Sequence, residues 1–284
     1  MPYVTVDQEN SSDIRLYYED HGAGQPVVLV HGFPLSGRSW EKQVPALLNL
    51  GYRVIPYDRR GFGRSSQPAF GYDYETFVAD LHQLITQLDL HHVVLAGMSM
   101  GGGEVARYLG KYGSERISKA AIISGVPPFL LKTADNPEGV EKSVFDGIVA
   151  SIQADRLAYL SSFLANFYNT DLLLGKRVSE EVVRDSWNIA ANASPTGTLA
   201  CVPAWGTDFR ADLSRIDVPT LVLQGDQDRI CPINATGMRT HQAIKGSRLV
   251  VLEGAPHGLL WTHAEDVNRE LTNFLGQSAQ ARAA

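Results

Sequence analysis

Short apolar runs alternate with helical patterns along this chain, and few folds accommodate that order. The apolar runs are rich in β-branched and aliphatic residues and cover 27–30, 53–57, 93–96, 120–123, 220–223 and 248–252. Apolar residues recur at helical spacing over 39–50, 74–88, 100–112 and 264–275. Such an alternation indicates a mostly parallel sheet flanked by helices. We therefore expect an α/β fold, with an antiparallel start at 3–6 and 14–18.

A mostly helical segment rich in aromatic residues, 126–212, interrupts this alternation. Each aromatic residue taken singly fits an ordinary helix core, but an all-helical insertion in an α/β chain is typical of a lid over a binding cavity. We expect a core of 1–125 and 213–276, a helical cap of 126–212 and a flexible tail of 277–284. The tail is expected because the last residues are small and polar.

Composition excludes several classes of protein. The 284 residues are 44% hydrophobic, enough for a buried core, and carry a net charge of −6, which disfavours nucleic acid as a partner. No apolar run approaches the ~18 residues of a membrane span, and the start lacks a signal-peptide pattern. Cys201 and Cys231 show neither a disulfide framework nor a metal-ligand spacing. We expect a cytoplasmic protein without metal or membrane association.

A candidate nucleophile lies in Gly97-Met98-Ser99-Met100-Gly101. This G-x-S-x-G motif follows an expected strand and opens an expected helix, which is the context of a nucleophile elbow. The two glycines allow a tight turn that exposes the Ser99 hydroxyl above the sheet. The N–H of Met100 then points toward any oxyanion near Ser99.

A serine hydroxyl needs a base, and the base needs an acceptor that fixes its tautomer. His257 follows the expected strand 248–252, and the carboxyl ends of parallel strands are where catalytic groups gather. Asp226 and Asp228 both follow the strand 220–223; we favour Asp228, which lies further past the strand end. The chain order nucleophile, acid, base is that of α/β hydrolases.

A second oxyanion donor is expected in the loop after the first buried strand. Phe33 offers its N–H there, whereas Pro34 has none and serves as a turn or shaping residue. The nearby Gly-rich stretch 57–65 lacks the spacing of a phosphate-binding loop. We interpret it as a structural turn held by pairing between Asp58 and an arginine.

The sequence resembles the α/β-hydrolase superfamily, and within it the cofactor-free haloperoxidases, also called perhydrolases or non-haem chloroperoxidases, which are close to aryl esterases and a γ-lactamase. The similarity extends over nearly the whole chain. The most distinctive stretches are 31–35, 57–65, 104–108, 135–139 and 255–259.

The resemblance implies a triad at Ser99, Asp228 and His257, with oxyanion donors at Phe33 and Met100. Pocket-lining positions of the family fall on Trp205, Phe163, Phe167 and Ile230. Met98 departs from the family, which commonly has an aromatic residue there, so we expect altered packing behind the elbow and an intact triad. No cofactor is implied, and a homo-oligomer is expected from the family alone.

These residues predict a serine hydrolase of small carboxylic esters that works through an acyl-enzyme. Hydrogen peroxide in place of water would give a peracid and hence apparent haloperoxidase activity. Dehalogenases and epoxide hydrolases of this fold use an aspartate nucleophile, and Ser99 argues against them. A γ-lactamase or amidase, a C–C bond hydrolase and a hydrolase-like small-molecule receptor remain open, because all are compatible with the same triad.

Overall fold

The computed structural model describes residues 2–280, with side chains through residue 276. Six strands form one parallel sheet in the order β4-β3-β5-β6-β7-β8. Their bounds are β3 Pro26–Val30, β4 Arg53–Tyr57, β5 Val93–Met98, β6 Ile117–Ile123, β7 Thr220–Gly225 and β8 Arg248–Leu252. The α/β fold with a mostly parallel sheet is thereby confirmed.

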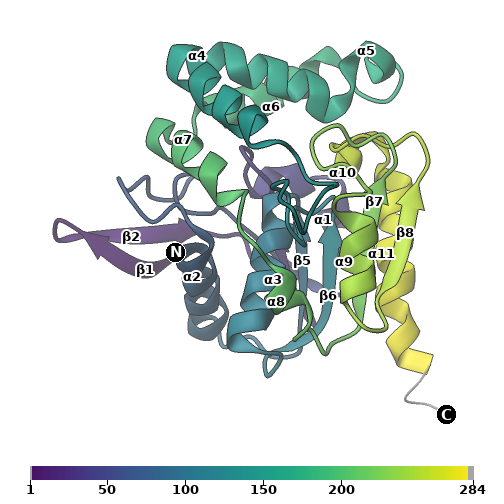
Figure 1. Ribbon diagram of the computed structural model, residues 1–284. Coiled ribbons are helices and arrows are strands. Elements are labelled where there is room, and N and C mark those ends of the chain that lie inside the picture. The colour runs from purple at the N-terminus through teal and green to yellow at the C-terminus, as the bar shows by residue number, and fades with distance from the viewer. Residues whose placement is uncertain (1, 281–284) are drawn as a thin grey trace.

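The antiparallel start is a separate two-stranded sheet of β1 (Tyr3–Glu9) and β2 (Ser12–Tyr17). The chain leaving it touches the main sheet through antiparallel bridges from Tyr18 to Tyr57 and from His21 to Val54. These bridges place the hairpin beside β4, at one edge of the sheet (Figure 1).

Helices cover both faces of the sheet (Figure 1). On one face, α1 (Gln43–Asn49) packs against α11 (Ala264–Gln280). On the other, α2 (Tyr74–Gln87), α3 (Met100–Tyr112), α8 (Arg210–Leu213) and α9 (Gly237–Ala243) form a continuous row. Helix α11 continues five residues beyond the expected end at 275, so 277–280 are helical. The flexibility expected of the tail stays a prediction, and residues 281–284 lie outside the described part.

Four further helices lie above the sheet in Figure 1, within the segment expected to be a cap. They are α4 (Lys142–Tyr168), α5 (Thr170–Leu173), α6 (Glu180–Ala191) and α7 (Pro195–Ala204). Helix α4 is kinked at Asp155, whose φ and ψ are −157° and 94°. The Asp155 carboxylate accepts the Ala158 N–H at 3.0 Å, so it caps the second half of α4. The boundaries 126 and 212 stay a prediction.

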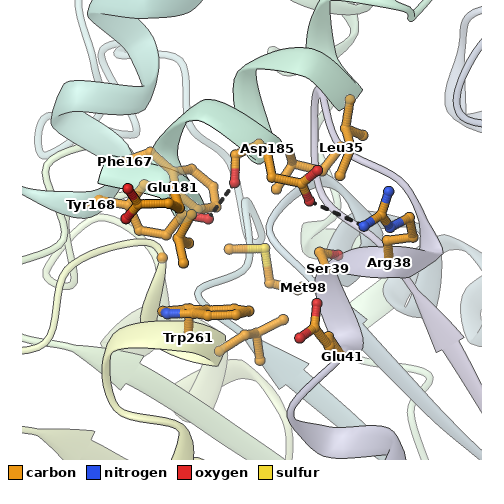
Figure 2. A pocket seen from close by; sticks show the side chains of 15 residues that line it. Leu35, Arg38, Ser39, Glu41, Met98, Phe167, Tyr168, Glu181, Asp185 and Trp261 are labelled. Carbon is orange, nitrogen blue, oxygen red and sulfur yellow. Dashed lines mark hydrogen bonds and ion pairs between the residues drawn. The ribbon is translucent and has the colours of Figure 1, made fainter. Parts of the chain in front are cut away.

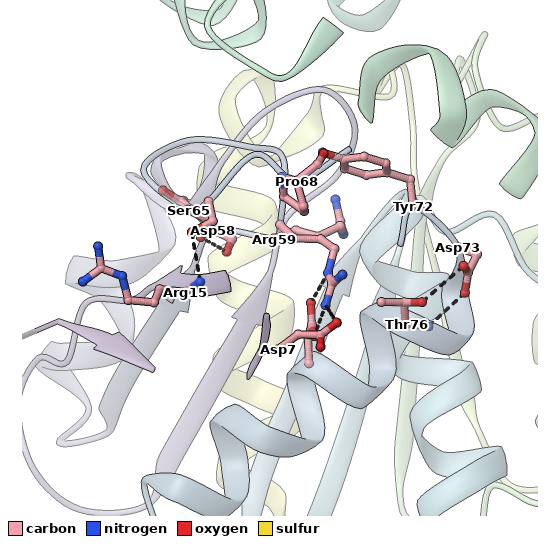
Figure 3. A network of polar contacts seen from close by, with 12 residues as sticks. Asp7, Arg15, Asp58, Arg59, Ser65, Pro68, Tyr72, Asp73 and Thr76 are labelled. Carbon is pink, nitrogen blue, oxygen red and sulfur yellow. Dashed lines mark hydrogen bonds and ion pairs between the residues drawn. The ribbon is translucent and has the colours of Figure 1, made fainter. Parts of the chain in front are cut away.

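The stretch 57–65 is a structural turn, but its ion pairing differs from the expectation. Asp58 accepts backbone N–H groups of Gly37 and Arg64 at 2.7 and 2.8 Å. Its carbonyl accepts the Ser65 hydroxyl (Figure 3). The buried arginines pair elsewhere, Arg59 with Glu104 and Arg60 with Asp80. Those carboxylates lie on α3 and α2, so the two arginines tie the turn to two helices.

Cys201 and Cys231 are both buried free thiols. No helix in the described part of the chain combines the length and apolarity needed to cross a bilayer.

Candidate active site

Ser99 lies at the tight turn between β5 and α3, with a positive φ of 56° and a ψ of −120°. Backbone strain at a non-glycine residue is typical of functional positions, and this conformation is that of a nucleophile elbow. Close contacts explain the glycines of the motif. A Cβ on Gly97 would collide with the carbonyl of Gly101, and one on Gly101 with the carbonyl of Val30.

His257 and Asp228 form a buried pair. Nδ1 of His257 lies 2.8 Å from Oδ2 and 3.0 Å from Oδ1 of Asp228, so this ring nitrogen donates to the carboxylate. Nε2, the other ring nitrogen, is buried and has no hydrogen-bond partner among the residues that the structure describes. A neutral imidazole in this tautomer presents an unused acceptor, which is what a general base requires.

The Asp228 carboxylate is held by three further donors. Oδ1 accepts the N–H groups of Ile230 and Cys231 at 2.9 and 2.8 Å, and Oδ2 accepts the side-chain amide of Gln224 at 3.1 Å. Gln224 is fully buried in β7 and was not singled out from the sequence, because nothing local marks it. Asp226 instead accepts the Gly254 N–H, so Asp228 is the carboxylate beside His257.

The loop after β3 approaches the elbow closely. A Cβ on Gly32 would lie 2.7 Å from the Met98 sulfur and 2.9 Å from Cβ of Ser99, so only glycine fits. Within the described residues, the N–H of the neighbouring Phe33 donates to no other group. Met100 opens α3, and the first N–H of a helix has no intrahelical partner. Met100 is the residue after Ser99, and Phe33 follows the glycine that contacts Ser99. The role of both N–H groups as oxyanion donors stays a prediction.

A buried polar network fixes this loop. Arg59 Nη2 donates to the carbonyl of His31 at 2.6 Å, and the Arg59 N–H donates to Nε2 of His31 at 3.0 Å. Nδ1 of His31 therefore carries the proton and donates to the Gly32 carbonyl. Burial, together with the Arg59 charge, holds the pKa of His31 well below its usual value, so the ring is neutral. The guanidinium is paired with Glu104, which joins the loop to α3.

A cavity of about 350 Å³ opens at Ser99, within the size range of small-molecule sites. Phe33, Phe163, Trp205 and Ile230 line it, as the resemblance implied. The Phe33 ring meets Trp205 and Phe163 edge-on, with centroids 4.8 and 5.6 Å apart. The other wall is mostly apolar and was missed from the sequence; it includes Val126, Leu130, Val140, Phe145, Ile148 and Tyr159.

Phe167 lies elsewhere. It lines a second cavity of about 250 Å³ behind the elbow, together with Met98, Tyr168 and Trp261 (Figure 2). Met98 points into this space, where a larger aromatic residue would occupy more of it. That packing behind the elbow differs from the family's stays a prediction; the contact of His257 with Asp228 is present.

Among residues 2–280, no group of three His, Cys, Asp or Glu side chains is arranged to hold a metal ion. Ser99 follows β5, and the buried pair of Asp228 and His257 follows β7 and β8, so these residues belong to the carboxyl edge of one parallel sheet. A serine and an acid–base pair at the same edge fit nucleophilic catalysis.

Comparisons with known proteins identify the family of the chain. Residues 25–264 match the family described as the α/β hydrolase fold. The chain is 64% identical to a putative non-heme chloroperoxidase of Synechocystis sp., over 97% of this chain and all of the relative. It is 34% identical to a bifunctional esterase/perhydrolase of Acinetobacter calcoaceticus, over 97% and 99% of the two chains.

A solved bromoperoxidase from Bacillus anthracis superposes with a TM-score of 0.93 at 50% identity, covering 96% of this chain and 99% of that one. The family match, the full-length relatives and the superposed structure all indicate the same fold. This chain belongs to the α/β-hydrolase family.

Proposed function

We propose that this protein is a serine esterase for small carboxylic esters that also produces peracids when hydrogen peroxide is present. The observation that carries the proposal is the buried pair of His257 and Asp228. Nε2 of His257 has no partner in the described part of the chain, and the loop of His257 and the strained Ser99 follow strands of the same parallel sheet. Relatives that are named as an esterase/perhydrolase and as non-heme chloroperoxidases support it.

In the first half-reaction, Nε2 of His257 takes the Ser99 proton while the serine oxygen attacks the ester carbonyl. The N–H groups of Phe33 and Met100 hold the negative charge that develops on the carbonyl oxygen. The alcohol leaves with the proton from His257, and Ser99 carries the acyl group. Asp228 keeps the imidazole in the tautomer that this transfer needs and stabilises its charged form.

In the second half-reaction, His257 deprotonates a water molecule that attacks the acyl-enzyme and releases the acid. If hydrogen peroxide attacks instead, the acyl carbon gains an O–O group and leaves as a peracid, with the proton returned to Ser99. The peracid then oxidises halide to hypohalous acid outside the site, while the peracid itself is reduced to the carboxylic acid. This sequence needs no redox cofactor.

The cavity favours short acyl groups. Its volume is about 350 Å³, and Phe33, Phe163 and Trp205 narrow it next to Ser99. We expect kcat/KM for p-nitrophenyl esters to fall as the acyl chain lengthens beyond a few carbons. Fastest turnover of long-chain esters would contradict this assignment of substrate size.

Ser99→Ala tests the proposal. The variant should lose on the order of 10⁴-fold in kcat for p-nitrophenyl acetate, and it should lose bromide oxidation in acetate and peroxide equally. Ser151→Ala, at an exposed serine of α4, is the matched control and should keep both activities. Near-wild-type rates in Ser99→Ala would refute the proposal.

A fluorophosphonate probe separates a reactive serine from an inert one in a receptor, because only an activated Ser99 is labelled. A panel of p-nitrophenyl acetate, a bicyclic lactam and a 1,3-diketone separates an esterase from an amide or C–C bond hydrolase. The expectation of a homo-oligomer stays a prediction, which the solution mass tests.

A further inference from the structure

The C-terminal end of α4 and the start of α5 touch both loops that carry the acid and the base. We call residues 167–171 the strap. They belong to the helical segment above the sheet, whereas Asp228 and His257 follow β7 and β8. The strap is therefore the place where the helical segment contacts the loops of the acid–base pair.

The strap contacts the His257 loop through a backbone hydrogen bond and an aromatic contact. The Gly258 N–H donates to the Phe167 carbonyl at 2.7 Å. The Phe167 ring lies edge-on to the His257 ring, with centroids 5.1 Å apart and planes at 81°. A Cβ on Gly258 would come within 2.7 Å of carbons of both Phe167 and Tyr168, so the loop and the strap are in tight contact.

On the side of the acid, Asn169 is joined to the residue that precedes Asp228. Its side-chain amide donates to the Gln227 carbonyl at 2.9 Å. Asn169 is buried, with 1% of its surface exposed, and has left-handed backbone angles of 48° and 54°. Arg229, on the other side of Asp228, pairs with Asp171 at 2.9 and 3.0 Å. That ion pair is exposed and contributes little, so the buried Asn169 contact is the stronger one.

The far side of the strap faces a cavity rather than packed protein. Phe167 and Tyr168 line the space of about 250 Å³ behind Met98, and the Tyr168 hydroxyl bonds Ser186 of α6 at 2.8 Å (Figure 2). Both rings are buried, but on this side they border an open space rather than other side chains. Its position depends on Asn169, on the Gly258 N–H and on α6.

We propose that Asn169 is a positioning residue, through which the strap holds the Asp228 loop against the His257 loop. The inference rests on the proposed function and assigns the helical segment a part in turnover, beyond covering the cavity. The two loops are separate chain segments, and their alignment decides how well Asp228 orients His257. A displacement of about 1 Å at such a contact costs on the order of 100-fold in rate.

Asn169→Gly is the sharpest variant, because glycine adopts the left-handed backbone without strain and lacks the donor. We expect kcat for p-nitrophenyl acetate to fall about 10- to 100-fold while KM changes less than about twofold. Asn169→Asp, which keeps size and backbone preference and removes the donor, should give the same loss. Asn10→Gly is the matched control: it changes an exposed asparagine with a φ of 49° in the β1–β2 turn and should leave kcat unchanged.

A second comparison separates positioning from loss of stability. In a His257→Ala background, Asn169→Gly should lower the residual kcat less than about twofold, because the strap then has no base to position. Equal losses in both backgrounds, or an unchanged kcat in Asn169→Gly and Asn169→Asp, would overturn the proposal. Ser99→Ala tests the esterase function independently, so failure of the function and failure of the strap are distinguishable.

Discussion

Glu104→Gln is expected to be the most damaging conservative substitution away from the reacting groups. Glu104 and Arg59 are 0% and 1% exposed, so water does not screen their charges. Two donors converge on the carboxylate: the Tyr57 hydroxyl on Oε2 at 2.7 Å and the Arg59 guanidinium on Oε1. A glutamine side chain has a single acceptor oxygen, so one of these donors must face an NH₂ group.

The magnitude follows from the charge that is left behind. Removing one partner of a buried ion pair costs about 3–5 kcal/mol, because the other charge stays buried without compensation. Typical domains have about 5–15 kcal/mol of stability in total, so this loss is a large fraction of it. Equilibrium unfolding in urea measures the difference directly. Activity measured alongside should fall as well, because Arg59 also holds the His31 carbonyl in the loop after β3, where an oxyanion donor is proposed.

A control variant and a double variant test this expected loss of stability. Asp146→Asn breaks the exposed pair with Lys142, 60% and 74% exposed, and should cost less than about 0.5 kcal/mol. Arg59→Met combined with Glu104→Leu removes both charges and should be more stable than Glu104→Gln alone. A cost below about 1 kcal/mol for Glu104→Gln, or a double variant as unstable as the single one, would contradict the argument.

Two further predictions concern the acid and the oxyanion loop. Asp228→Asn should lower kcat about 10⁴-fold by reversing the tautomer of His257. Asp226→Asn, the control, should leave kcat nearly unchanged. Similar rates for the two variants would exclude Asp228 as the acid. Burial lowers the pKa of His31 in the folded state. Below about pH 6.5 the unfolded chain therefore binds a proton that the folded chain does not. The free energy of unfolding then falls as the pH drops, by up to about 1.4 kcal/mol per pH unit. His31→Asn should flatten the dependence of unfolding free energy on pH between 6.5 and 5, and an unchanged slope would contradict this.

Local sequence patterns were sufficient to predict the strands of the sheet and the turn at Ser99. The apolar runs became β3 to β8, and Ser99 lies at a strained turn between strand and helix, because strand, glycine and helix signals are read within a few residues. The choice of Asp228 over Asp226 also agreed with the contact of Asp228 with His257. It depended only on how far each residue lies past the end of β7.

Contacts between distant segments could not be predicted in this way. Asp58 was expected to pair with an arginine of the same turn, yet the buried Arg59 pairs with Glu104, 45 residues away on α3. Asn169 and Gln227 are 58 residues apart, and neither belongs to a motif. Phe167 was assigned to the pocket at Ser99 from a looser part of the resemblance, and it packs on His257 instead. Periodicity reports which face of a helix is buried, and it carries no information on what that face meets.

The two supports of the site act on different parts of it. The Arg59–Glu104 pair joins the loop after β3 to α3, the helix that follows Ser99, and both elements flank or leave the sheet. The strap reaches the acid and base loops from the helical segment above the sheet. The geometry around Ser99 is therefore set within the core, whereas the alignment of Asp228 with His257 also depends on α4 and α6. Because of that division, substitutions in the helical segment are expected to alter turnover as well as substrate choice.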